Sequence, residues 1–200
     1  MGYTTNHMAY SKSEIEKIGN TLVYLCKNIG EPVSKTKIIK LLYFIEEFSM
    51  KKFGKPFLGL EWEVWHLGPV AEDIYAEIND PFMLSDFIEI TSMNGYDGNF
   101  VCAKNEFNDD EFSDSEIELL NTLIAKLGNM TANELIEFSH KPHTLWYKLS
   151  KENNLLDSFH NRTKTTTDIK IDLSNLLPEG KKDIYFNYLE QKDIKRLYGN

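Results

Sequence analysis

Residues 38–45 read IIKLLYFI, and this stretch decides the fold. It lies in a segment that starts near Ser34, a residue type that caps helices, and ends at Gly54, so we expect one helix over 34–54. Lys40 is the only charged residue in the eight. Because such a helix has no polar face to give to water, the sequence predicts that it is the buried central helix of the domain.

The segments on either side of this helix have different periods. On the N-terminal side, Ser11 or Ser13 can cap a helix that runs to about Asn28, and its apolar residues recur every three or four positions. On the C-terminal side, apolar residues alternate with Glu61, Glu63 and Trp65 over 58–65, as in a half-buried strand. This register predicts that Glu61, Glu63 and Trp65 share the outward face.

The middle of the chain predicts a short helix and a hairpin. Pro69 is expected in the first turn of a helix that carries Ile74 and Ile78. Two apolar stretches, 87–92 and 99–104, flank a turn with the dipeptides Asn94-Gly95 and Asp97-Gly98. Such dipeptides are typical of tight hairpin turns, so the two stretches should pair antiparallel.

The remainder of the chain reads as mainly helical. Ser113 with Glu116 and Thr131 with Glu134 form two possible capping boxes, and Trp146 opens a further short helix. A polar, Thr-rich stretch over 160–170 is expected to be a loop or a loosely held edge, and a last helix runs from about Gly180 to Tyr198. We therefore predict a mainly helical α+β fold with a buried central helix and a small antiparallel sheet (58–65, 87–92 and 99–104) on one side.

Charge is distributed unevenly along the 200 residues. The net charge is −9, but residues 1–56 carry +4, residues 57–120 carry −15 with a single lysine, and residues 121–200 carry +2. Only two of the 22 basic residues are arginine, which disfavours direct nucleic-acid binding. The chain has no apolar run near 20 residues and no apolar stretch at its N-terminus, so we expect no membrane span and a cytoplasmic location. Cys26 and Cys102 are expected to be buried thiols in a reducing compartment.

Signatures of catalysis and of cofactor binding are missing from the sequence. There is no GxxxxGK[ST], no GxGxxG after a strand and no GxSxG. Glu137 and His140 are three apart on one expected helix, with His143 beyond Pro142, which leaves a metal-assisted hydrolase as an alternative. The other interpretation is a protonated His140 that favours the helix C-terminus. We expect no catalytic residue, metal or cofactor.

The segment WEVWHLGPV, residues 62–70, brings two tryptophans and a histidine next to a Gly-Pro turn. In one interpretation Trp62 anchors the core while Gly68 and Pro69 shape the turn. In the other, Trp65 and His66 project as an anchor for another protein, because exposed aromatic residues dominate binding hot spots. The second interpretation predicts that Trp65→Ala spares folding and weakens binding. The predicted partner-binding residues are Glu61, Glu63, Trp65, His66, Gly68 and Pro69.

Three stretches arrive in an order that resembles the Panacea-domain (SocA-like) antitoxin family: KTKIIKLLYFIEEFSMKKFGKPFL, EWEVWHLGPVAEDIY and ELIEFSHKPHTLWYK. The resemblance covers about residues 13–150, and Ser139 stands where the family often has Thr. The Gly54-Lys55-Pro56 turn and the Trp65, Gly68-Pro69-Val70 motif belong to it. The family-motif residues elsewhere are Lys37, Lys40, Leu41, Tyr43, His140 and Trp146.

The resemblance implies a non-enzymatic antitoxin that neutralises a cognate toxin by binding it or by delivering it to a protease. We assign a Panacea domain to residues 1–155 and predict that residues 156–200, which lie beyond the resemblance, form a C-terminal extension whose terminal helix packs on the same domain. The acidic middle adds the expectation that the toxin is basic. A phage-encoded interaction protein that binds a host factor is a further alternative.

Overall fold

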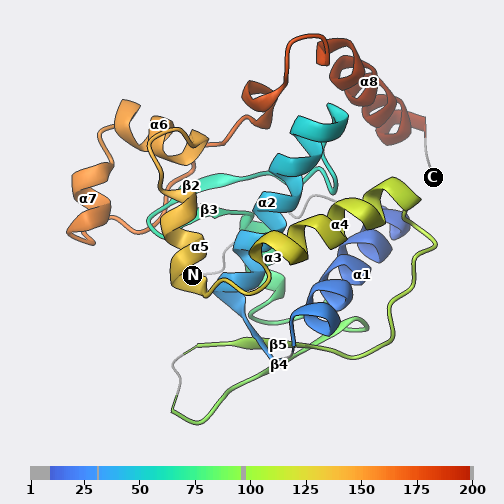
Figure 1. Cartoon of the computed structure of the whole chain (residues 1–200), viewed down its shortest axis with the longest axis horizontal. Coiled ribbons are helices and arrows are strands. Elements are labelled where there is room, and N and C mark those ends of the chain that lie inside the picture. Colours follow the sequence, from blue (N-terminus) through green and yellow to red (C-terminus); the bar gives the residue numbers. More distant parts are fainter. Residues whose placement is uncertain (1–9, 31, 96–97, 199–200) are drawn as a thin grey trace.

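The computed structural model describes residues 10–30, 32–95 and 98–198, and helix α2 (Lys35–Phe53) forms its centre (Figure 1). Ser34 caps the helix by accepting a hydrogen bond from the Lys37 amide. Gly54 ends it in the left-handed conformation, with φ of 74°. The helix is buried along most of its length, charged residues included. The predicted central helix is therefore confirmed.

Two further helices lie on the same side of α2, and one of them, which starts at Asp114, packs directly against it (Figure 1). Helix α1 (Lys12–Ile29) begins with a capping box formed by Ser11 and Glu14. Helix α4 (Asp114–Leu127) begins with the predicted box of Ser113 and Glu116. In both, the serine side chain and the glutamate carboxylate satisfy backbone N–H groups that the first turn leaves open. These boxes explain why the helix starts could be located from sequence.

A small antiparallel sheet closes one end of α2. Its strand order is β1 (Val33–Ser34), β5 (Phe100–Ala103) and β4 (Ile88–Thr91). The predicted pairing of 87–92 with 99–104 is confirmed, with Ile90 opposite Val101. Gly95 has φ of 86°, as a tight turn requires, whereas Asp97 lies outside the described residues.

The prediction that residues 58–65 form the third strand of this sheet was wrong. Residues 63–65 form β2 (Glu63–Trp65), which pairs with β3 (Gly68–Val70) in a separate hairpin instead of joining β4 and β5. The strand is short because the Glu46 carboxylate accepts the amides of Phe57, Leu58 and Leu60, which removes them from any ladder. Pro69 therefore lies in a strand, and helix α3 (Glu72–Glu77) starts three residues later.

The C-terminal half adds short helices and one longer helix. These are α5 (Ala132–Ser139), α6 (Leu145–Glu152), α7 (Leu156–His160), the 3-10 turn η1 (Leu173–Leu176) and α8 (Lys182–Tyr198). In Figure 1, α5 and α6 lie next to the β2–β3 hairpin. In α8, Lys192 donates to the Gly59 carbonyl at 3.4 Å.

The predicted burial of the two cysteines has a different outcome for each. Cys26 is buried, as expected, but Cys102 is only half-buried. No helix within the described ranges combines the length and the apolar character needed to cross a membrane.

Candidate functional site

The β2–β3 hairpin reverses the chain tightly against the end of α5. Trp65 pairs with Gly68, which has φ of 101°, a conformation that L side chains rarely adopt. A Cβ atom at Gly68 would lie 2.6 Å from Ser139 Oγ and 2.9 Å from Lys40 Cε. Glycine is therefore needed both for the turn and for the close approach of α2 and α5.

The buried side chain of Lys40, in α2, supports the hairpin. Its side chain is 1% exposed, and its Nζ donates to the Pro69 carbonyl at 2.7 Å. Burial lowers the pKa of Lys40 to about 7, because the charged form loses its hydration. The polar interruption that the sequence shows in α2 is thus the donor that fixes β3.

Trp146 and His140 also support the hairpin. Trp146, in α6, donates from its Nε1 to the Trp65 carbonyl at 2.7 Å. The His140 ring stacks on Trp146 with 3.7 Å between centroids. Burial, aided by Lys40 and His66, lowers the pKa of His140 to about 4. The predicted protonated His140 at the helix C-terminus is therefore wrong, because at neutral pH the ring is uncharged.

These contacts bring residues of the three family-like stretches to one place: Lys40, the hairpin residues Trp65 to Pro69, and His140 with Trp146. The model of the antitoxin SocA-like family, Panacea domain, matches residues 38–147. The chain belongs to this family. No curated protein and no solved structure matched the chain.

The other Panacea motif residues hold α2 in its surroundings. Lys37 donates to the Gly128 carbonyl at 2.6 Å, which ties α2 to the end of α4. Leu41 is fully buried in the core. Tyr43 donates to Glu47 at 3.0 Å, and its ring packs edge-on against Trp62. The hydrogen bonds of Lys37 and Tyr43 are made outside the hairpin, so the motif has a central-helix part as well as a hairpin part.

The outer side of the hairpin differs from the predicted partner surface. Glu63 is buried, whereas Glu61 is exposed, and both carboxylates contact Lys170 at 2.9 and 3.1 Å respectively. Trp65 is half-buried, with its Nε1 bound to Glu63 and its ring packed edge-on against Tyr75. The expectation that Glu63 and Trp65 simply face solvent was wrong.

Burial also limits which hairpin residues a partner can touch. Gly68 and Pro69 are buried and contribute their backbone to the contacts with α2 and α5. His66 is half-buried, and Leu67, which the sequence analysis did not single out, is 40% exposed at the tip. The reachable part of the predicted surface is therefore Glu61, the open edge of Trp65 and His66, and the structure adds Leu67.

The Thr-rich stretch of the C-terminal extension lies along β2. The amides of Val64 and His66 donate to the carbonyls of Ile169 and Thr165, each at 3.0 Å, and the Ile171 amide donates to the Trp62 carbonyl at 2.7 Å. Of the two predicted possibilities for 160–170, the held edge is the one observed. Its β-branched threonines fit an extended backbone, but the partner strand, a hundred residues away, gave no sequence signal.

The acidic middle of the sequence is partly neutralised by folding. Lysines of α1 and α2 pair with acids of the 104–118 stretch: Lys17 with Glu116 at 2.7 Å, Lys27 with Glu106 at 3.2 Å and Lys52 with Glu118 at 3.2 Å. The charge segregation along the sequence therefore becomes charge pairing in space. The surface that remains acidic is smaller than the sequence indicates.

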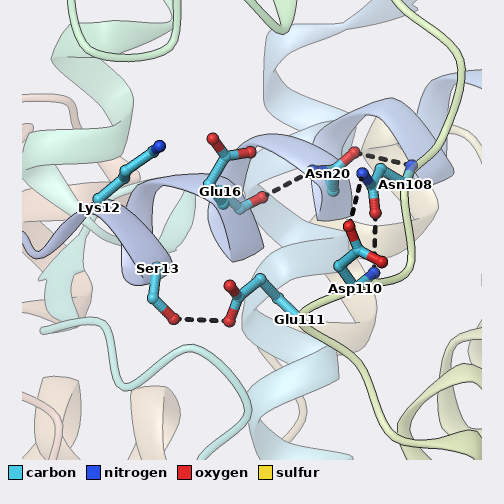
Figure 2. A pocket seen from close by; sticks show the side chains of 7 residues that line it. All are labelled: Lys12, Ser13, Glu16, Asn20, Asn108, Asp110 and Glu111. Atoms are coloured by element: carbon cyan, nitrogen blue, oxygen red, sulfur yellow. Dashed lines mark hydrogen bonds between the residues drawn. The ribbon is translucent and has the colours of Figure 1, made fainter.

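A polar cavity lies on another side of the domain (Figure 2). Its volume is about 440 Å³, and Asn20 binds the Asn108 amide while Glu111 accepts a hydrogen bond from Ser13 across it. No group of three or more His, Cys, Asp or Glu side chains in the described ranges is arranged to hold a metal ion. The Glu137, His140 and His143 side chains, all among the described residues, therefore do not form such a group.

Proposed function

We propose that this chain neutralises a partner toxin by binding it directly. The observation that carries the proposal is the match of residues 38–147 to an antitoxin family, together with the convergence of the motif residues on one hairpin. Membership of an antitoxin family indicates a non-catalytic role. Preorganisation of the hairpin lowers the entropy cost of binding, which is how a binding surface gains affinity without chemistry.

The proposed contact surface is the outer side of the β2–β3 hairpin. Glu61 and Glu63 share the single ammonium group of Lys170, which leaves one net negative charge at its edge, and Leu67 with the open side of Trp65 supplies apolar area. Gly68, Pro69 and Glu63 act from behind this surface by holding its backbone and the Trp65 ring. A basic toxin would gain both electrostatic attraction and apolar burial there.

Co-expression with the product of an adjacent small reading frame tests the proposal. We expect the product to stop growth when expressed alone and growth to resume when this chain is present. A product that is harmless alone, or equally toxic with this chain present, would refute the proposal. The amount of toxin after rescue separates two modes, because inhibition leaves it unchanged while delivery to a protease lowers it.

A matched pair of variants tests the surface itself. Leu67, at the hairpin tip, and Met93, in the β4–β5 turn, are 40% and 37% exposed. We expect Leu67→Ser to weaken rescue and Met93→Ser to leave it intact, with equal thermal stability. Equal rescue by both variants would remove the hairpin tip from the contact surface.

A further inference from the structure

Phe82 is the most exposed large apolar side chain among those described. It lies in the segment between α3 and β4 and is 89% exposed, compared with 58% for Phe186 in α8. A solvent-exposed phenylalanine adds no apolar contacts to the core of the domain, and the stabilising free energy that burial of its ring would provide is absent. Exposed apolar groups of this size mark interaction sites when they are held in a fixed position.

The backbone around Phe82 is fixed by a buried carboxylate. Glu77 is buried, and its Oε2 accepts the amides of Phe82 and Leu84 at 3.1 and 3.0 Å. Ser85 donates from its hydroxyl to the Phe82 carbonyl at 2.8 Å. Ile78 and Leu84, on either side, are fully buried in the core. The loop is therefore tied down on both sides while the Phe82 ring points into solvent.

Negative charge flanks this ring. Asp80 and Asp86 are exposed, and within the described part of the chain neither forms an ion pair. Lys35 donates to the Asn79 side-chain oxygen at 2.6 Å and Lys104 to the Ser85 carbonyl at 2.7 Å. Both nearby ammonium groups are thus bound to neutral oxygens, which leaves the two carboxylates available to a partner.

From these observations we infer that the loop 79–86 is a docking knob, with Phe82 as its anchor. Its occupant is a basic protein that offers an apolar pocket ringed by lysine or arginine. This inference rests on the proposed function, in which that protein is the toxin. The rigid loop supplies the aromatic anchor at low entropy cost, and Asp80 and Asp86 supply the matching charge at its rim.

A second copy of this chain fits the knob less well. Two grooves among the described residues combine apolar side chains with lysines. In the groove lined by Leu60, Trp62 and Leu189, Lys170 is paired with Glu61 and Glu63, and Lys192 donates to the Gly59 carbonyl. The other groove is lined by Phe48 and Leu119 with three lysines. Lys51 and Lys52 are already paired with Glu47 and Glu118, and Lys126 lies over the Phe48 ring. Little positive charge remains there to meet Asp80 and Asp86. A separate basic protein is therefore favoured over self-association.

Affinity measurements with two phenylalanine variants test the inference. The probe is the purified product of the adjacent reading frame, titrated with wild type, Phe82→Ala and Phe186→Ala. We expect Phe82→Ala to weaken binding at least tenfold and Phe186→Ala to change it less than twofold. We expect both variants to keep the melting temperature of the wild type. Asp80→Asn with Asp86→Asn should slow association and reduce its dependence on salt.

The outcomes separate the inference from the proposed function. Wild-type affinity in Phe82→Ala, with toxin rescue intact, would overturn the docking role and leave the antitoxin function standing. Failure of the wild type to rescue would reject both, because the inference rests on that function. A lowered melting temperature in Phe82→Ala would show that the ring serves the fold. A concentration-dependent dimer of the chain alone that Phe82→Ala abolishes would assign the knob to a second copy instead.

Discussion

Two aromatic residues, Trp65 and Phe82, flank helix α3 in the sequence, and their side chains differ in exposure. Before the helix, Trp65 is turned partly inward, with its Nε1 bound to Glu63 and its ring against Tyr75 of α3 itself. After the helix, Phe82 is turned outward and is almost wholly exposed. Both backbones are fixed by buried charged groups, so rigidity does not distinguish them. The difference lies in where the support comes from.

The hairpin that carries Trp65 is supported from distant parts of the chain. Lys40 reaches it across 29 positions, Trp146 across 81 and Lys170 across 107. The loop that carries Phe82 is supported mainly by Glu77, five and seven positions away. Changes in the hairpin should therefore disturb the whole domain, whereas changes in the Phe82 ring should disturb only what binds to it.

Gly68→Ala should produce the largest loss of stability. The new Cβ would meet Ser139 and Lys40 at less than 3 Å, and the residue would keep a positive φ, so we expect a loss of about 3 kcal/mol or more in the free energy of unfolding. Gly30→Ala is the matched control, because Gly30 has φ of 93° with no atom within 4 Å of a new Cβ. It should cost about 1–2 kcal/mol. Equal losses in urea denaturation would show that the hairpin packs loosely.

Lys40 gives the stability of the hairpin a pH dependence. The pKa of Lys40 is about 7 in the folded protein and near 10.5 when unfolded, so the unfolded chain binds more protons between these values. The free energy of unfolding should therefore rise from pH 7 to pH 9, and the Lys40 contribution should level off below pH 7, where both states hold the proton. Lys40→Met should lack this rise.

The titration of His140, which lies beside the hairpin, falls outside the pH range of this measurement. The pKa of His140 is about 4, below its ordinary value, so His140 affects stability only between about pH 4 and 6.5. Urea denaturation of both proteins at pH 7, 8 and 9 supplies the comparison. An equal rise in wild type and Lys40→Met would show that Lys40 is not the group responsible.

The features that could be predicted from the sequence are those supported by nearby residues, and the features that were missed depend on distant residues. The capping boxes of α4 and α5 were predicted because Ser113, Glu116, Thr131 and Glu134 act within one turn. The burial of Glu63 was missed because its partner, Lys170, is 107 positions away. Long-range pairing leaves no periodic signal in one sequence.

Pro69 and Phe82 show two other limits. Proline suits a first helical turn, but the close contact of Gly68 with α2 and α5 placed Pro69 in a strand. Phe82 lies beside Pro81 between two aspartates, a local pattern that the sequence analysis did not use. Its meaning depends on exposure, which only the fold supplies.

Trp65→Ala and Phe82→Ala should differ in their effect on the free energy of unfolding. Trp65→Ala removes an edge-on contact with Tyr75 and the donor to Glu63, so we expect a loss of about 1–2 kcal/mol. Phe82→Ala should leave the free energy of unfolding unchanged within about 0.5 kcal/mol. Denaturation at one pH and temperature is the measurement. A larger loss from Phe82→Ala than from Trp65→Ala would reverse the roles assigned to the two rings.

The smallest expected effect concerns the acids. Burial alone would raise the pKa of Glu116, but hydrogen bonds from Lys17 and Ser113 hold it below its ordinary value, so its contribution is present at neutral pH and is lost on acidification. Glu116→Gln should cost about 0.5–1 kcal/mol. Asp86 is exposed and unpaired among the described residues, so Asp86→Asn should leave the melting temperature unchanged.

The dependence of stability on salt concentration distinguishes Glu116→Gln from Asp86→Asn. Raising the ionic strength from 0.05 to 0.5 M should reduce the difference between wild type and Glu116→Gln, because the Lys17 pair at 2.7 Å is screened. It should not affect the stability of Asp86→Asn relative to wild type. If Asp86→Asn lost stability and salt abolished the loss, Asp86 would belong with the paired acids that hold α1 and α4 together. The charge beside Phe82 would then serve the fold instead of a partner.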